Sequence, residues 1–249
     1  MPGFASLLAA SALHVASLNL CTDEYLLLLA RPSEVASVSR LAQDPAESSL
    51  WRRARAFPAN RGAIEQVIGM HPSLLLTMGG GARSTGAIAA RLGMRVIDLP
   101  FPTSIDDVAA NMRTTAALLG DARRAGPWLA RLQRLRAEPR ALKDSIWVSG
   151  GGTSLVPASP GAQWMAVAGL RQRRLPGARA DLETLLVKPP TVLLRSNYRS
   201  GQMSQGTRWF DHPIVKRLAG RTVATDGRAW TCAGPLMLAE VERLRRVVR

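Results

Sequence analysis

Short apolar runs alternate with amphipathic stretches along most of the chain. In the first half, apolar runs predict strands at four places: 14–18, 35–38, 73–77 and 95–99. In the second half, similar runs at 146–149 and 222–225 flank further helical segments. Strands that alternate with helices form parallel sheets covered by helices, so the pattern predicts an α/β fold.

One passage occurs twice, once in each half of the chain. Residues 64–76 read IEQVIGMHPSLLL, and residues 182–194 read LETLLVKPPTVLL. Each copy predicts a short amphipathic helix that ends before a proline and is followed by a buried strand. The repetition predicts two similar lobes rather than one continuous domain.

The alternation stops between residues 120 and 142. This arginine-rich stretch predicts one long helix, with Leu129, Leu132 and Leu135 on its buried side and Pro127 in its first part, where proline costs least. We therefore expect an α/β protein with two Rossmann-like lobes, each with a parallel sheet, joined by a single long helix. The expected divisions are 13–119, 120–142 and 143–249.

The charge of the chain is strongly basic, with a formal net charge of +15 that comes almost entirely from arginine. Such an excess favours a nucleic acid, an anionic surface or an anionic small ligand, although a solvated basic surface explains it equally well. The arginines are dispersed, which weakens the nucleic-acid interpretation. That alternative, a basic nucleic-acid-binding α/β protein, predicts affinity that falls steeply with salt.

Motifs for catalysis are lacking. The glycine loops 79–81 and 150–152 follow strands, as phosphate-binding turns do, but neither completes a dinucleotide or P-loop fingerprint. The three histidines have no spacing typical of a metal site or a catalytic triad, and no histidine neighbours a cysteine. We predict no catalytic residue, no bound metal and no cofactor, and keep a nucleotide-using α/β enzyme as the less favoured alternative.

Most of the aromatic side chains, and several arginines, lie in or next to loops that follow predicted strands. In open α/β sheets the carboxyl ends of the strands face the ligand crevice. We therefore predict a cleft for a large, partly anionic and partly apolar ligand, although any single tryptophan is equally well explained by packing. The predicted ligand-binding residues are Tyr25, Trp51, Arg83, Trp164, Tyr198, Arg199, Arg208, Trp209, Arg228 and Trp230. Trp128 and Trp147 are assigned to packing.

The two cysteines, Cys21 and Cys232, each follow a predicted strand, one in each lobe. They either form one bridge between the lobes or remain two separate buried thiols. At the N-terminus, the triplet Ala10-Ser11-Ala12 after a short apolar stretch suggests a truncated signal sequence, and a frayed extension is the alternative.

Glu65 and Glu183 occupy equivalent positions in the two copies of the repeat. An acidic residue near a helix start interacts favourably with the helix dipole, which is a purely structural explanation. The functional alternative is a pair of acidic contacts, one per lobe, for a dimeric basic partner.

Four passages together resemble a known family: SLNLCTDEYLLLLA, RGAIEQVIGMHPSLLLT, RLGMRVIDLPFPTSIDDV and AWTCAGPLMLAEVERL. They resemble the periplasmic solute-binding proteins of ABC importers for cobalamin and ferric siderophores, and the resemblance extends over about residues 13–248. It implies two lobes joined by one long helix, little hinge motion, and a ligand in the shallow cleft between the lobes.

The resemblance also implies that Glu65 and Glu183 dock onto arginines of the dimeric permease. His71 departs from the family pattern, where lysine is more usual, and the second lobe is compact. The histidine and carboxylate set of metal-ion relatives is lacking, which favours a chelated ligand. We expect a monomeric, non-enzymatic periplasmic protein that carries a corrinoid (cobalamin) or ferric-siderophore chelate to its permease and binds no nucleic acid.

Overall fold

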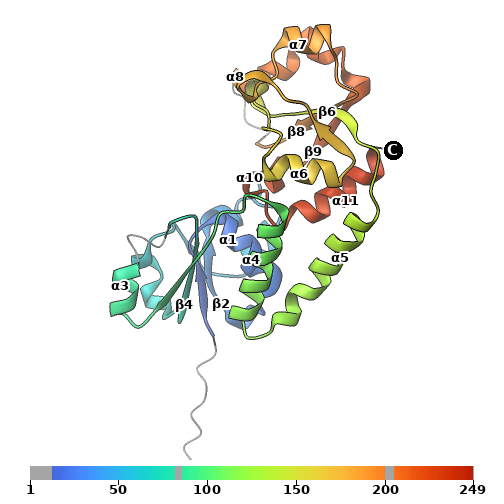
Figure 1. Cartoon of the computed structure of the whole chain (residues 1–249). Helices are drawn as coiled ribbons and strands as arrows, with labels where there is room; N and C mark the ends of the chain where they lie inside the picture. Colours follow the sequence, from blue (N-terminus) through green and yellow to red (C-terminus); the bar gives the residue numbers. More distant parts are fainter. Residues whose placement is uncertain (1–12, 82–85, 200–204, 249) are drawn as a thin grey trace, which may run out of the picture.

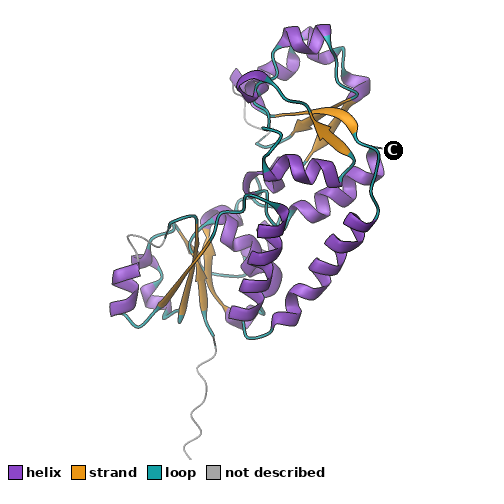
Figure 2. Cartoon of the chain, viewed as in Figure 1, coloured by secondary structure: helices purple, strands orange, loops and turns teal. Residues whose placement is uncertain are grey.

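The computed structural model describes residues 13–81, 86–199 and 205–248. The N-terminal triplet discussed above lies outside these ranges. Two α/β lobes follow each other along the chain, one at the lower left and one at the top of Figure 1, with the helices of the junction between them (Figures 1 and 2). The predicted fold class is therefore confirmed.

The first lobe contains a five-stranded parallel sheet in the order β3-β2-β1-β4-β5. The strands are β1 (Val15–Ser17), β2 (Val35–Ser39), β3 (Ala59–Asn60), β4 (Leu74–Met78) and β5 (Arg95–Leu99). The helices are α1 (Leu20–Leu29), α2 (Trp51–Ala54), α3 (Gly86–Arg91) and α4 (Ile105–Leu118). Ser104 and Asp107 form a capping box at the start of α4, which fixes where this helix begins.

The second lobe contains a four-stranded parallel sheet in the order β7-β6-β8-β9. The strands are β6 (Lys143–Val148), β7 (Leu170–Gln172), β8 (Val192–Ser196) and β9 (Thr222–Thr225). The helices are α6 (Pro160–Val167), α7 (Leu182–Val187), α8 (Gln205–Arg208), α9 (Pro213–Lys216), α10 (Gly227–Cys232) and α11 (Met237–Val247). In both lobes the next strands in sequence add to one side of the first strand, and the later strands then add to its other side. Such a switch point places a crevice at the carboxyl ends of the strands.

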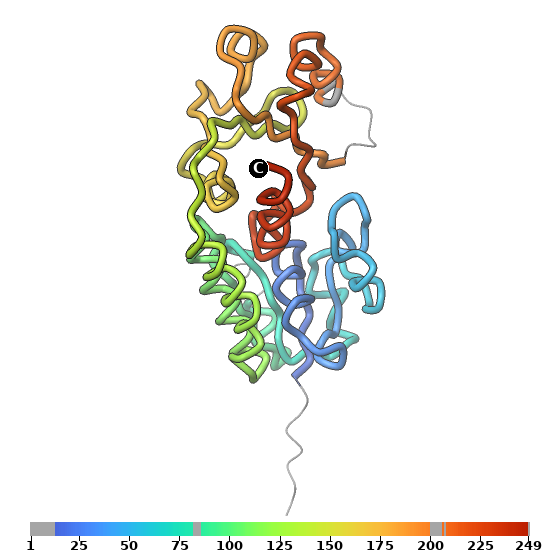
Figure 3. Tube along the Cα trace, turned by 90° about the vertical axis from the view of Figure 1, so that its right-hand side faces the viewer, coloured from blue at the N-terminus to red at the C-terminus, as the bar shows by residue number. Residues whose placement is uncertain are grey.

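The connection between the lobes is shorter than predicted. A 3₁₀ turn, Ala122–Ala125, leads into α5 (Gly126–Ala137), and residues 138–142 continue without helix to β6. The prediction of one helix over 120–142 was wrong at its end because Pro139 disfavours helical backbone at the residue before it. Figure 3 shows the chain rising along α5 from the lower lobe to the upper one.

The repeated passage also differs between the lobes. In the second copy α7 forms, and Asp181 caps it by accepting a hydrogen bond from the backbone N–H of Thr184. In the first copy Ala63 stands at the capping position, and the predicted helix is replaced by two 3₁₀ turns, Ile64–Gln66 and Ile68–Met70. The short helix predicted in the first copy was therefore wrong, since that segment lacks the side-chain cap that stabilises its counterpart.

The largest apolar core crosses the junction between the lobes. It joins Leu26 of α1 and Met112 of α4 to Trp128 of α5, Trp164 of α6 and Val241 of α11. Two smaller clusters fill the outer faces of the sheets, one in each lobe. Because one continuous core holds both lobes, the fold favours a fixed angle between them over a wide hinge motion.

Candidate functional site: a cavity between the lobes

A cavity of about 400 Å³ lies where the two lobes meet. The lining residues from the first lobe stand at or after the ends of β1, β2, β4 and β5. Those from the second lobe come after β8 and β9. The lining residues are Asn19, Leu20, Cys21, Leu41, Glu47, Met78, Phe101, Tyr198, Arg199 and Thr231. Carboxyl ends of parallel strands from two lobes thus converge on one space, and its size is typical of a small-molecule site.

One wall of the cavity is apolar and unusually exposed. Phe101, directly after β5, has 56% of its surface exposed, and Leu41, after β2, has 37% exposed. A ligand that covers large apolar side chains beside a cavity removes their surface from water, which favours binding. This wall therefore favours a ligand with an extended apolar surface.

Another part of the lining carries a polar contact between the lobes. The carboxylate of Glu47, a buried first-lobe residue, accepts hydrogen bonds from Tyr198 Oη at 2.5 Å and from Arg199 Nε at 2.6 Å. Burial, and then the hydrogen bond to Glu47, raise the pKa of Tyr198, so its hydroxyl stays protonated and remains a donor. The contact holds the loop after β2 against the second lobe and gives the cavity a fixed polar edge.

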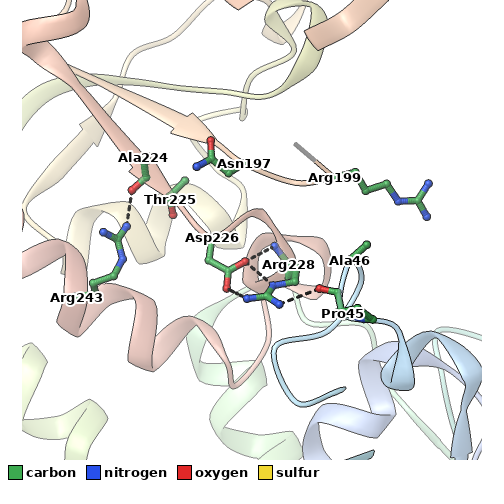
Figure 4. A pocket seen from close by; sticks show the side chains of 9 residues that line it. All are labelled: Pro45, Ala46, Asn197, Arg199, Ala224, Thr225, Asp226, Arg228 and Arg243. Carbon is green, nitrogen blue, oxygen red and sulfur yellow. Dashed lines mark hydrogen bonds and ion pairs between the residues drawn. The ribbon is translucent and has the colours of Figure 1, made fainter. Parts of the chain in front are cut away.

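A second inter-lobe contact lies beside the first, in a pocket of about 500 Å³ (Figure 4). Arg228, at the start of α10, donates to the backbone oxygens of Pro45 at 3.0 Å and Ser48 at 3.4 Å. Burial alone would raise the pKa of Asp226, but its hydrogen bonds with Arg228 and the charge of that residue lower it. Asp226 therefore stays ionised and orients the guanidinium toward the first lobe.

The two cysteines form a disulfide that joins the lobes. Cys21 in α1 and Cys232 in α10 are bonded, with their Cα atoms 5.4 Å apart. Of the two alternatives left by the sequence, the structure contains the bridge. Since Cys21 also lines the cavity, this covalent link is part of the cavity wall.

Two carboxylates of α1, next to the cavity residues Leu20 and Cys21 in the sequence, are buried. Asp23 is fully buried and accepts hydrogen bonds from the backbone N–H and the hydroxyl of Ser39, the last residue of β2. Burial raises the pKa of Asp23 to about 7 and raises that of Glu24 well above its usual value. Asp23 thus holds α1 against the end of β2, and the loop after β2 contains Leu41 and Glu47.

Of the ten residues predicted to contact ligand, Tyr198 and Arg199 line the cavity, and Arg228 lines the pocket beside it. Arg83 lies outside the described residues. Tyr25, Trp164 and Trp230 were wrongly predicted, because they are core residues with 0%, 0% and 9% of their surfaces exposed. Trp164 donates from Nε1 to the backbone oxygen of Ala233 at 2.9 Å, which holds the segment between α10 and α11.

The remaining three predicted residues lie away from the cavity lining. Trp51 is half-buried on α2, where the guanidiniums of Arg52 and Arg55 stack on its ring at 4.4 and 4.5 Å. Arg208 and Trp209 line a separate pocket at the outer part of the second lobe. The packing assignment of Trp128 and Trp147 is confirmed, since both are 8% exposed.

Residues that the sequence did not single out supply most of the lining, including Leu41, Glu47, Met78 and Phe101. A usable signal existed for Met78 and Phe101, because each lies at or just after the end of a predicted strand. Glu47 carried no such signal, since it lies in a long polar connection and its partner Tyr198 is 151 residues away.

Glu65 and Glu183 are both exposed, one on each lobe. Within the part of the chain that the structure describes, neither side chain has a hydrogen bond or an ion pair. Two unpaired carboxylates at equivalent places in the repeat are available to a partner. In the described ranges no helix is long and apolar enough to cross a membrane.

Comparisons with known proteins give matches in structure only; no protein-family model and no curated sequence matches the chain. A periplasmic heme-binding protein of Vibrio cholerae matches with a TM-score of 0.72 and 15% identity, over 96% of this chain and 99% of that one. One from Pseudomonas aeruginosa matches with a TM-score of 0.68 and 17% identity, over 94% and 91% of the two chains. The periplasmic vitamin B12-binding protein of Vibrio cholerae matches with a TM-score of 0.63 and 18% identity, over 94% and 95%.

At these identities the similarity shows the fold. The chain has the two-lobed fold of periplasmic binding proteins for heme and vitamin B12, as its sequence resemblance predicted. The similarity covers both lobes and the connection between them.

Proposed function

We propose that this protein is the periplasmic substrate-binding component of an ABC importer and carries a metal chelate in the cavity between its lobes. The observation that carries the proposal is the convergence of strand ends from both lobes on one cavity with an apolar wall and a polar edge. The structural neighbours, which bind heme or vitamin B12, support the same class of role. No catalytic step is part of this function.

The chemistry of the cavity favours a flat or bulky organic chelate over a bare ion. Phe101, Leu41, Met78 and Leu20 offer apolar contact, whereas a bare cation needs several converging oxygen, nitrogen or sulfur ligands. Among the described residues no group of three or more histidine, cysteine, aspartate or glutamate side chains is placed to hold an ion. Corrinoids, ferric siderophores and heme share the required combination of an apolar face and polar substituents.

A binding panel tests the ligand class. The purified protein is mixed with cyanocobalamin, hemin and a ferric siderophore, and tryptophan fluorescence and the thermal midpoint are followed. We expect quenching and a raised midpoint with at least one of the three, because a ligand that binds only the folded state stabilises it. If none of them changes either signal, the proposed ligand class is wrong.

We further propose that Glu65 and Glu183 dock onto basic residues of the permease, one lobe on each subunit. Their exposure, their lack of partners among the described residues and their equivalent places in the repeat support this role. Charged residues at an interface control the rate and the specificity of association more than they add raw affinity. Loss of these charges should therefore affect delivery rather than ligand binding.

The double variant Glu65→Lys, Glu183→Lys tests the docking role, with Glu138→Lys as a control on an exposed residue of the connection. Unlike the two glutamates of the repeat, Glu138 lies 3.6 Å from an arginine, Arg245, so the folding of this control is checked first. We expect the double variant to abolish transport and leave ligand affinity unchanged, and the control to transport normally. A collapse of ligand affinity in the double variant, or transport at the control level, contradicts the assignment.

A further inference from the structure

A second cavity in the outer layer of the second lobe contains an arginine, Arg195, that forms no ion pair with any residue the structure describes. The cavity, of about 590 Å³, lies between the outer face of β8 and β9 and the segment 210–219. Its lining is Leu193, Arg195, Asn197, Phe210, Asp211, Val215, Lys216, Ala219, Thr222 and Ala224. None of these residues belongs to the lining of the inter-lobe cavity.

Arg195 stands at a position where the strand pattern calls for an apolar residue. It is the one residue of β8 that is not buried, and it shares a face with Leu193, which belongs to the apolar cluster on the outer face of the sheet. Its Cα partner on β9 is Ala224, which is too small to cover it. The guanidinium instead stacks on the ring of Phe210, with its central carbon 4.2 Å from the ring centroid.

No carboxylate among the described residues pairs with Arg195. Its Nε is buried without a hydrogen-bond partner, and no ion pair to Arg195 is formed within the described ranges. At the rim, Lys216 lies 3.8 Å from Asp211, so these two exposed charges largely cancel each other. A partly buried guanidinium that is stacked on one face and unpaired at its edge is costly unless an anion completes its hydrogen bonds.

The rest of the lining specifies what kind of anion fits. Leu193, Phe210, Val215 and Ala219 surround Arg195 with apolar surface, which repels a fully hydrated inorganic ion. A planar guanidinium binds a carboxylate through two parallel hydrogen bonds, and the apolar walls then cover the body of the ligand. The net charge of +15 also raises the local concentration of anions near the protein.

We propose that this cavity is a second ligand site, which binds an organic monocarboxylate with an apolar body through Arg195. The site is separate from the proposed chelate cavity, since the two share no lining residue; Asn197 and Ala224 also line the inter-lobe pocket around Arg228. It gives this protein a binding activity beyond the delivery of a chelate.

Titration calorimetry with sodium octanoate tests the proposal, with 1-octanol and inorganic phosphate as matched probes. We expect octanoate to bind at one site per chain, octanol to bind at least tenfold more weakly, and phosphate not to bind measurably. Octanol binding as tight as that of octanoate would show that the charge of Arg195 is not used. Phosphate binding as tight as that of octanoate would show that the apolar lining is not used. Either result overturns the proposal.

Variants place the site. We expect Arg195→Gln to weaken octanoate binding at least tenfold, and Arg171→Gln, an exposed arginine of β7, to leave it unchanged. Arg199→Gln, in the inter-lobe cavity, should also leave it unchanged; loss of binding there instead would assign octanoate to that cavity and refute the proposal. If Arg195→Gln does not fold, Arg195→Lys replaces it, because lysine keeps the charge but cannot form the two parallel hydrogen bonds of a guanidinium. Unchanged octanoate affinity in Arg195→Lys counts against the proposal.

Because these titrations use no chelate, their outcome is separate from the test of the proposed function.

Discussion

The disulfide between the lobes allows the most quantitative prediction. Reduction of the bond, or the double variant Cys21→Ser, Cys232→Ser, frees two residues that are 211 positions apart in the chain. In the chain-entropy description, closing a loop of that length destabilises the unfolded state by about 5 kcal/mol, and measured values are typically about 2–4 kcal/mol. We therefore expect a loss of about 3 kcal/mol in the free energy of unfolding.

Urea denaturation of oxidised and reduced protein measures this loss. For a chain of this size the dependence of the unfolding free energy on urea is about 3 kcal/mol/M, so the midpoint should fall by about 1 M on reduction. The serine double variant should match the reduced protein and show no response to reductant. Equal midpoints for oxidised and reduced protein would refute the view that this bond restricts the unfolded chain.

Two further predictions concern the buried carboxylates around the cavity. Burial raises the pKa of Asp23 from 3.8 to about 7, so folding favours the protonated carboxyl. The contribution of this group to the unfolding free energy is complete below about pH 4 and is lost as the pH rises toward 7. Relative to the wild type, Asp23→Asn should therefore gain stability across this range, by up to about 1.4 kcal/mol per pH unit, measured by urea denaturation at pH 4 to 7. A parallel pH dependence in the two proteins would contradict the raised pKa. For the inter-lobe contact, Glu47→Gln should lower the unfolding free energy by about 2 kcal/mol, because Arg199 loses a charged acceptor. Glu138→Gln, at a side chain that is 76% exposed, is the control, and equal losses in the two variants would argue against the inter-lobe contact.

The alternation of elements was predictable because its cause is local. A strand covered on both faces, such as Leu74–Met78, consists almost entirely of apolar residues and is recognisable without any knowledge of its neighbours. The same holds for the capping box of Ser104 and Asp107, whose two side chains lie within one helical turn. Boundaries were less predictable where one residue decides, as Pro139 does at the end of α5.

The candidate site was less predictable because its contacts join distant parts of the chain. Tyr25 follows β1 closely enough to suggest a crevice, yet it lies on a helix that is buried on nearly all sides, so its ring enters the core. Glu47 was missed for another reason, since it lies in a long polar connection where nothing local indicates burial. Its carboxylate is bound by Tyr198 and Arg199, which come from the second lobe and are far away in the sequence.

The central claim is that a chelate binds in the cavity between the lobes, and titration calorimetry on two matched variants tests it most directly. The chelate that binds the wild type most tightly is titrated into Phe101→Ala and Leu92→Ala. Phe101 is 56% exposed and lines the cavity, whereas Leu92 is 48% exposed and does not line it. Loss of an aromatic contact with the ligand costs about 1.4 kcal/mol, which weakens binding about tenfold. We predict that weakening for Phe101→Ala and unchanged affinity for Leu92→Ala. Equal affinity in both variants would contradict binding in this cavity.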